Sequence, residues 1–307
     1  MNLRDLHYFI VLAEVKHFGE AAKRCFVSQP TLSMQIKKLE ETLGVTLFER
    51  TKKQIFLTDQ GHALLGRVKK ILLLVDEMKD IACQLNDPFS GELRLGVIPT
   101  VSPYLLPLVM PSIQKNFPNL KVWLVEEQTH RLTNMLEEGG LDAAIMAQPI
   151  EKHFKSQFLF EEEFYFACAN TNPLAHAKTI AINDLTHQQV MLLEEGHCLR
   201  DQAMAVCQMA KANDVADFTA TSLETLRLMV QAGMGVTLIP ALAAFTTSSD
   251  LLRFVPFAKP APSRSIGLFY RSGTPKIKCL TAIAEKIISI VSVVLARRNE
   301  ENAILGG

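Results

Sequence analysis

The fold of the N-terminal part is decided by residues 18–50, which read FGEAAKRCFVSQPTLSMQIKKLEETLGVTLFER. A short helix is expected over Glu20 to Cys25. Ser28 is a good N-cap and Pro30 suits a first helical turn, so a second helix begins there and ends at Gly44. Two helices joined by a tight turn are typical of a helix-turn-helix, whose second helix enters the major groove of DNA.

The side chains on the exposed side of that second helix are polar. Gln and Ser can reach base edges, while Lys and Thr can hold phosphates. After Gly44, a basic turn and Ile55 to Leu57 predict a short β-ribbon, a wing that grips phosphates. The residues expected at DNA are Ser28, Gln29, Pro30, Thr31, Ser33, Gln35, Lys37, Lys38, Arg50, Lys52 and Lys53. Spacing alone leaves open an ordinary helical bundle with a polar face.

The charge distribution supports this interpretation. The net charge is zero, but residues 1–70 carry 12 Lys/Arg against 7 Asp/Glu, and the remainder carries 20 against 25. A basic head on an acidic body fits a nucleic-acid partner for the head alone, although chance could also produce five excess charges.

Composition excludes several classes of protein. With 48% hydrophobic and 21% charged residues, the chain is not disordered, and its six cysteines are too few for a disulfide-stapled scaffold. There is no CxxC pair, so we expect no zinc site, and no cofactor is indicated. No apolar run reaches about 18 residues and no signal peptide is evident, so we expect no membrane contact and a cytoplasmic location.

A long helix is expected from Asp59 to about Asn86, capped by Thr58. An apolar residue recurs along it in steps of four and three, which is a heptad seam that needs a partner. These residues are Leu64, Val68, Ile71, Val75, Met78, Ala82 and Leu85. A second copy of the chain is the simplest partner, and the body of the same chain is the alternative. Residues 86–91 then form a hinge.

The rest of the chain alternates between expected strands and helices, which predicts a parallel, open α/β sheet. Ligands bind such sheets at the carboxyl ends of the strands. This places Thr100, Ser102 and Thr129 at the mouth of a pocket, unless they only cap helices. The final helix is expected over Cys279 to Leu295.

Two cysteines stand apart from the other four, which read as buried apolar residues. Cys198 follows a strand and precedes a helix, next to His197 and Arg200, which would favour a thiolate; Glu194 and Glu195 would oppose it. In a continuous helix, Cys207 lies about 13 Å from Cys198, too far for a disulfide, so bonding would require local unwinding. The alternative is two unrelated structural cysteines.

The N-terminal 50 residues resemble the signature of LysR-type regulators. The match runs from Leu6-x-x-Phe9 through Phe18-x-x-Ala21-Ala22 and Val27-Ser28-Gln29-Pro30-Thr31-Leu32-Ser33 to Leu43-Gly44-Val45-x-Leu47-Phe48-Glu49-Arg50. The resemblance implies a winged helix-turn-helix over 1–58, a dimerising linker helix over 59–87 and a regulatory domain over 91–307. That domain would be a two-lobed, periplasmic-binding-protein-like α/β fold, with lobe I at 91–162 and 266–307 and lobe II at 163–265.

The segment from Gly196 to Cys207 resembles the redox segment of the peroxide-sensing members of this family, as do 98–107, 128–130 and 220–227. The resemblance implies that Cys198 reacts with hydrogen peroxide and that Cys207 resolves the product as a disulfide, reversible by cellular thiols. Thr100 and Thr129 would bind peroxide, His197 and Arg264 would supply positive charge, and Asp201 could assist proton transfer. It also implies a homotetramer on promoter DNA, transcription activation and contact with RNA polymerase.

Two other functions are weighed against this one. A LysR-type regulator could instead bind a small organic ligand between the lobes, which would make Cys198 dispensable. An enzyme or solute-binding protein with the same α/β body is disfavoured by the N-terminal head and by the absence of a recognisable metal cluster or catalytic triad in the sequence.

Overall fold

The computed structural model describes residues 1–50, 55–150, 153–210, 215–246 and 250–305. It divides into two compact units, Met1–Ala82 and Cys83–Gly307, and each is described here by itself. The expected Lys52 and Lys53 lie outside the described residues, and of Arg50 only the backbone is described.

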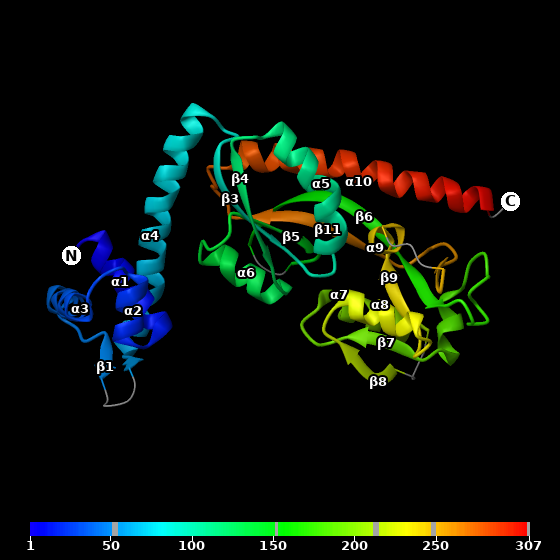
Figure 1. The fold of residues 1–307 in the computed structure, drawn as a ribbon, viewed down its shortest axis with the longest axis horizontal. Helices are drawn as coiled ribbons and strands as arrows, with labels where there is room; N and C mark the ends of the chain where they lie inside the picture. The colour runs from blue at the N-terminus through cyan, green and yellow to red at the C-terminus, as the bar shows by residue number, and fades with distance from the viewer. Residues whose placement is uncertain (51–54, 151–152, 211–214, 247–249, 306–307) are drawn as a thin grey trace. The chain divides into compact units, whose positions relative to one another are not determined.

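The first unit is a winged helix-turn-helix, as the sequence predicted (Figure 1). Its core is formed by one face of each helix, including Phe9, Leu12, Leu32, Ile36 and Leu39, which are almost fully buried. The two strands of the wing pair antiparallel. The elements are α1 (Leu3–Val15), α2 (Phe18–Arg24), α3 (Gln29–Leu43), β1 (Phe48–Arg50) and β2 (Ile55–Leu57).

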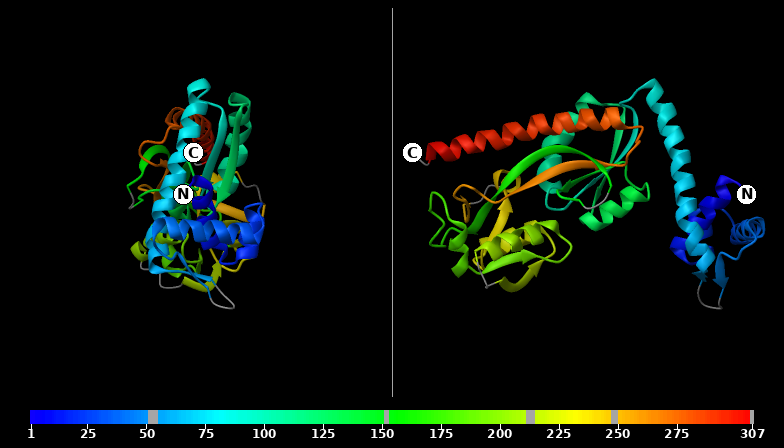
Figure 2. Two further views of the ribbon diagram at one scale, coloured as in Figure 1. Left: turned by 90° about the vertical axis from the view of Figure 1, so that its left-hand side faces the viewer. Right: turned by 180° about the vertical axis from the view of Figure 1, so that it is seen from behind.

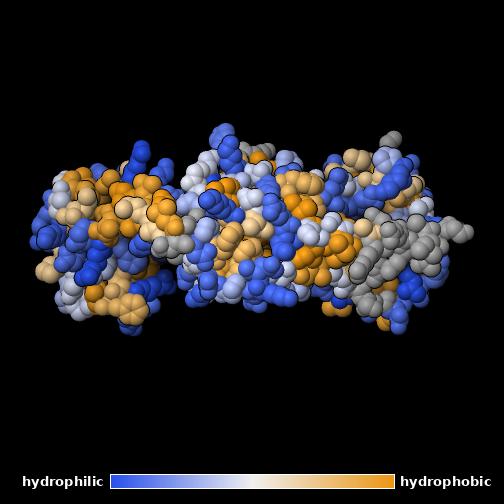
Figure 3. Space-filling view, turned by 90° about the horizontal axis from the view of Figure 1, so that it is seen from above, coloured by the Kyte–Doolittle hydropathy of each residue, from blue (hydrophilic) through white to orange (hydrophobic). Residues whose placement is uncertain are grey.

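The long helix α4 (Asp59–Asn86) has the predicted bounds. Thr58 Oγ1 accepts a hydrogen bond from the Gly61 backbone N–H at 2.9 Å, which caps the helix start. Of the heptad seam, Val68 is 5% exposed, whereas Met78 is 69% and Leu85 is 82% exposed. Figure 3 shows hydrophobic side chains gathered on the surface of the first unit. The distal seam therefore needs a partner to be buried.

The second unit is a two-lobed α/β fold. In lobe I, β3 lies between β4 and β5 and is parallel to both. In lobe II, β7 and β8 pair in parallel. Helices α5 and α6 belong to lobe I, and α7 and α8 belong to lobe II. The elements are β3 (Gly91–Val97), α5 (Ser102–Asn116), β4 (Leu120–Glu126), α6 (Thr129–Glu137), β5 (Ala143–Ala147), β6 (Lys155–Ala169), η1 (Ile182–His187), β7 (Val190–Leu193), α7 (Cys198–Met209), β8 (Val215–Ala220), α8 (Leu223–Gln231), β9 (Thr237–Pro240), α9 (Ala241–Phe245), β10 (Leu252–Pro256), β11 (Ser263–Tyr270) and α10 (Ile277–Leu305).

One strand runs through both lobes. Residues 155–163 of β6 pair with β11, and residues 164–169 pair with β9 and β10. Figure 2 shows β6 and β11 running together past both groups of helices. The sheets are parallel only in part: β6 and β11 cross between the lobes and pair antiparallel with each other and with β5, β9 or β10, which the alternation of strands and helices did not predict.

The last helix also differs from expectation. Residues 277–296 of α10 are long and apolar enough to cross a membrane by length and composition alone, so the statement that no such stretch exists was wrong. Lys278, Glu285 and Lys286 interrupt the apolar residues of this segment. Leu280, Ile283, Ile287 and Val291 recur at helical spacing and are almost fully buried in the core of the second unit. This buried stripe accounts for part of the hydropathy of the helix, since 33% of the apolar window is buried.

Candidate functional site

Cys198 is the first residue of α7, directly after the loop that follows β7. All four residues of β7 are buried, so the loop starts at a fixed point. Gly196 turns the chain with φ +92°, a conformation that L side chains rarely adopt. His197 is the N-cap but makes no side-chain capping hydrogen bond. The half-buried Cys198 thiol is therefore presented at a helix N-terminus, where a thiolate is favoured.

Thr100 and Thr129 reach the same place from lobe I. Thr100 follows β3 and Thr129 opens α6 after β4, so both lie beyond the carboxyl ends of two adjacent parallel strands. Neither caps its helix, because the N-caps are Val101 and Gln128. Together with Cys198, these segments line a small, tightly filled pocket whose walls are Ile98, Pro99, Thr100, Gln128, Thr129, Gly196, His197 and Cys198.

A buried ion pair lies behind Thr100. Arg264, at the start of β11, donates from Nη1 to Thr100 Oγ1 at 3.0 Å and from Nη2 to the Thr100 carbonyl at 3.1 Å. Its Nε donates to Glu162 Oε1 at 2.9 Å, and the two side chains are 1% and 0% exposed. The guanidinium is thus held in one place by three acceptors.

The pKa of the Cys198 thiol is raised, chiefly by burial, which disfavours the charged form. The positive charge of Arg264, the Thr129 hydroxyl and the Leu199 backbone N–H act in the opposite direction and lower this pKa. The charge of Asp201, which is exposed in the first turn of α7, raises it. The resting sulfur is therefore a thiol near neutral pH, surrounded by groups that stabilise its anion.

The positive charge expected from His197 is opposed by the burial of its side chain. Burial lowers the pKa of its imidazole, although nearby Glu194 and a hydrogen bond with the Thr221 backbone act to raise this pKa. Its Nε2 lies 3.8 Å from Glu194 Oε1 and has no hydrogen-bond partner among the described residues. Burial thus acts against a positive charge on His197, whereas the Arg264 guanidinium lowers the pKa of Cys198.

Cys207 lies near the other end of α7 and is 2% exposed. Because α7 is continuous, the two cysteines are separated by nine residues of helix, or about 13 Å along its axis. Both thiols are free, and burial raises the pKa of Cys207. The two sulfurs can meet only if α7 unwinds.

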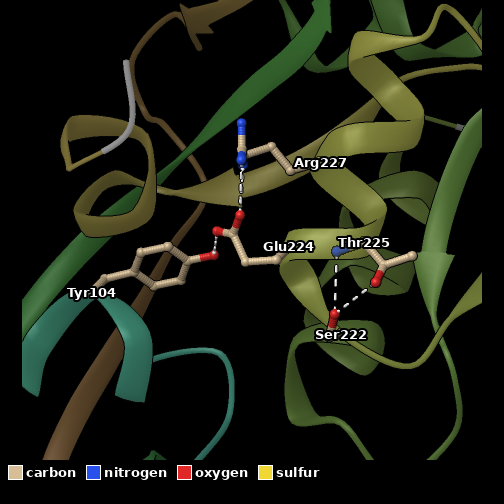
Figure 4. A network of polar contacts seen from close by, with 5 residues as sticks. All are labelled: Tyr104, Ser222, Glu224, Thr225 and Arg227. Atoms are coloured by element: carbon tan, nitrogen blue, oxygen red, sulfur yellow. Dashed lines mark hydrogen bonds and ion pairs between the residues drawn. The ribbon is translucent and has the colours of Figure 1, made fainter. Parts of the chain in front are cut away.

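A polar network joins the two lobes next to this site (Figure 4). Tyr104 of α5 donates from Oη to Glu224 Oε1 of α8 at 2.7 Å. Arg227 donates from Nη2 to Glu224 Oε2 at 2.8 Å. Burial alone would raise the pKa of Glu224, but these hydrogen bonds and the charge of Arg227 hold this pKa below its usual range. Sequence reasoning missed this network, because its partners are 120 residues apart.

In the first unit, most of the expected DNA-contacting residues lie on α3 or at its N-cap, and Arg50 lies in β1 of the wing. Ser28 Oγ accepts the Thr31 backbone N–H at 3.3 Å and caps the helix. Gln29, Pro30, Lys37 and Lys38 are exposed, and Thr31, Ser33 and Gln35 are half-buried. Lys37 pairs with Glu41 at 3.8 Å on the surface. The helix start is thus ordered and its polar face is open to a groove.

Comparisons with known proteins are consistent over both units. Residues 3–62 match the family model of the bacterial regulatory helix-turn-helix protein, lysR family, and residues 86–287 match the LysR substrate binding domain. The chain is 45% identical over 289 residues to the DNA-binding transcriptional dual regulator OxyR of Escherichia coli K12, covering 94% of this chain and 95% of the relative.

Solved structures give the same picture. A full-length OxyR variant from Pseudomonas aeruginosa matches with a TM-score of 0.75 and 33% identity, covering 94% of each chain. The oxidized form of OxyR matches 67% of this chain and 98% of that chain, with 43% identity and a TM-score of 0.61.

Proposed function

The chain belongs to the LysR family of transcriptional regulators, and we propose that it is a DNA-binding regulator that senses hydrogen peroxide through Cys198 and Cys207. The observation that carries the proposal is the surroundings of Cys198. Its thiol starts a helix, faces two threonine hydroxyls and lies in the field of a buried guanidinium. A helix N-terminus, a nearby cation and hydroxyl donors are the groups that favour a reactive thiolate, and they act here against the effect of burial.

The first step is attack on peroxide. The Cys198 thiolate displaces hydroxide from one peroxide oxygen, so that the sulfur is oxidised to a sulfenic acid and the peroxide is reduced. Thr100 Oγ1 accepts from Arg264, which leaves its own O–H free to donate to a peroxide oxygen. Thr129 Oγ1 is buried without a nitrogen or oxygen partner among the described residues and can do the same. Arg264 stabilises the anions in this step, and Asp201 can accept a proton.

The second step joins the two cysteines. The Cys207 sulfur attacks the sulfenic sulfur, a disulfide forms and water leaves; cellular thiols reverse the step by exchange. Because the two ends of α7 are about 13 Å apart, the helix must unwind for this bond to form. The disulfide therefore converts a local oxidation into a change of fold.

The elements of the first unit account for DNA binding and for dimerisation. We assign the exposed face of α3 and the wing to promoter DNA, and the exposed seam of α4 to a homodimer, with two dimers forming a tetramer. Refolding of α7 changes how the regulatory domains pack and thereby the spacing of the DNA heads, which alters contact with RNA polymerase. A regulator of this kind acts in the cytoplasm, where its promoter and its thiol reductants are.

The organic-ligand alternative is disfavoured by size. The pocket at Cys198 has essentially no free volume for a bound organic molecule in this form, whereas pockets for small organic molecules hold about 300–1,000 Å³.

The test is differential alkylation with mass spectrometry after one equivalent of peroxide. We expect a Cys198–Cys207 disulfide with the other four cysteines free. A Cys198→Ser variant should lose the response while still retaining promoter DNA. A reduced Cys198 in the wild type, or a normal transcriptional response of the variant, contradicts the proposal.

A further inference from the structure

A fully buried carboxylate lies one layer behind the reactive cysteine and has no role in the steps above. Glu162 is in the middle of β6, and its side chain has no exposed surface. Its neighbours Glu161 and Glu163 point the other way, because successive side chains of a strand alternate. They meet Ser263 and Lys259 at the surface. Burying a carboxylate is costly unless it is fully paired.

The pairing of Glu162 is complete. Oε1 accepts Arg264 Nε at 2.9 Å and lies 2.8 Å from Arg264 Nη2. Oε2 accepts the backbone N–H of Leu242, in the first turn of α9, at 2.8 Å. Glu162 and Arg264 are also direct cross-strand partners of β6 and β11. The strand register and the helix start therefore fix the carboxylate, and the carboxylate fixes the guanidinium.

Arg264 connects Glu162 to the peroxide site. The guanidinium that Glu162 holds contacts Thr100 through both its hydroxyl and its carbonyl. It is also the main positive charge acting on the Cys198 sulfur. Without Glu162, a buried arginine would lose the partner that sets its direction.

We propose that Glu162 is a positioning residue for the reaction with peroxide, which it supports by holding Arg264 against Thr100 and Cys198. This inference rests on the proposed function. It predicts that Glu162 acts only through Arg264. A residue that merely neutralised Arg264 would have the opposite effect, because removing its charge would leave a stronger field at the sulfur and faster reaction.

The experiment measures two quantities on the full-length reduced protein: the rate of Cys198 oxidation by peroxide, and the pH profile of Cys198 alkylation. For Glu162→Gln we expect the alkylation profile to move to higher pH and the oxidation rate at pH 7 to fall about tenfold or more, as for loss of a nearby opposite charge. Glu161→Gln is the matched control, since it removes the same charge one residue away on the outer face, and it should react like the wild type.

A paired replacement covers the case in which Glu162→Gln does not fold. Glu162→Met with Arg264→Met removes both buried charges, which proteins often tolerate. Its rate should equal that of Glu162→Gln with Arg264→Met, which also lacks both buried charges, because residue 162 has no effect once Arg264 is gone. Different rates for these two double variants, or a Glu162→Gln that reacts as fast as the wild type or faster, overturn the inference. Failure of the wild type itself to oxidise at Cys198 contradicts the proposed function instead.

Discussion

Replacement of Gly196 by alanine should shift the redox equilibrium toward the disulfide. Gly196 has φ +92°, and a Cβ built there would lie 2.6 Å from Gln128 Oε1. The substituted residue would be strained by its backbone conformation, and the Gln128 amide would have to move. Both the backbone strain and the displacement of Gln128 destabilise the reduced form, in which α7 is intact.

The size of the shift in the redox equilibrium follows from the backbone strain at residue 196. A non-glycine residue in a left-handed conformation costs about 1–2 kcal/mol. If unwinding of α7 releases this strain, the disulfide form gains that free energy relative to the dithiol. For a two-electron couple this corresponds to about 20–40 mV, or roughly 5–30-fold in the equilibrium constant. Displacement of Gln128 adds to the effect in the same direction.

The assay equilibrates the wild type and Gly196→Ala in dithiol–disulfide buffers of defined ratio and quantifies the Cys198–Cys207 disulfide by mass spectrometry. Gly273→Ala is the control. Gly273 has φ +84° and no described atom within 4 Å of a built Cβ, and it lies outside the refolding segment. It should destabilise both redox forms alike and leave the midpoint unchanged. An unshifted midpoint for Gly196→Ala, or one that favours the dithiol, would refute the reasoning.

Three further predictions concern the resolving cysteine, the link between the lobes and the DNA head. Cys207→Ser should abolish the disulfide while Cys198 still forms a sulfenic acid that a nucleophilic trap captures; a disulfide between Cys198 and any other cysteine would contradict this. Tyr104→Phe removes a hydrogen bond to a carboxylate and should lower the free energy of unfolding at pH 7 by about 1–2 kcal/mol in urea titrations. Because the pKa of Glu224 is lowered in the folded state, this contribution is present above the unfolded pKa of a glutamate and is lost as the pH falls through the folded one. An equal loss on both sides of that range would show that the carboxylate is not the partner. Lys38→Ala should reduce the slope of log K against log salt for promoter binding by about one; an unchanged slope would remove Lys38 from the interface.

Much of the first unit could be predicted, because its information is local. Ser28, Pro30 and Gly44 mark helix ends through backbone chemistry that depends on neighbours only, and α3 begins and ends where they indicate. The Thr58 cap and the hinge that begins at Asn86 likewise marked the bounds of α4. The heptad spacing also predicted an apolar seam along α4. The distal part of this seam is exposed because a single chain does not bury it.

The second unit was harder for a physical reason. The first half of β6 reads Lys-Ser-Gln-Phe-Leu-Phe-Glu-Glu-Glu, which lacks the alternation of polar and apolar residues typical of a strand. It was not recognised as a strand, and β10 was missed as well. Both acquire their structure from strands that are distant in sequence, and β11 closes the sheet with antiparallel pairs that local pattern does not reveal.

By itself, the sequence determined the head, the linker helix, the alternation of strands and helices, and the presence of two cysteines nine residues apart. These depend on turn chemistry, periodicity and spacing, which are properties of neighbouring residues. Only the tertiary structure decided that Thr100, Thr129 and Cys198 line one pocket, that burial acts against a charge on His197 and that Glu162 holds Arg264 behind them. Charge and burial at a site depend on which distant segments pack there, and strand register across about 100 residues brings Glu162 to Arg264.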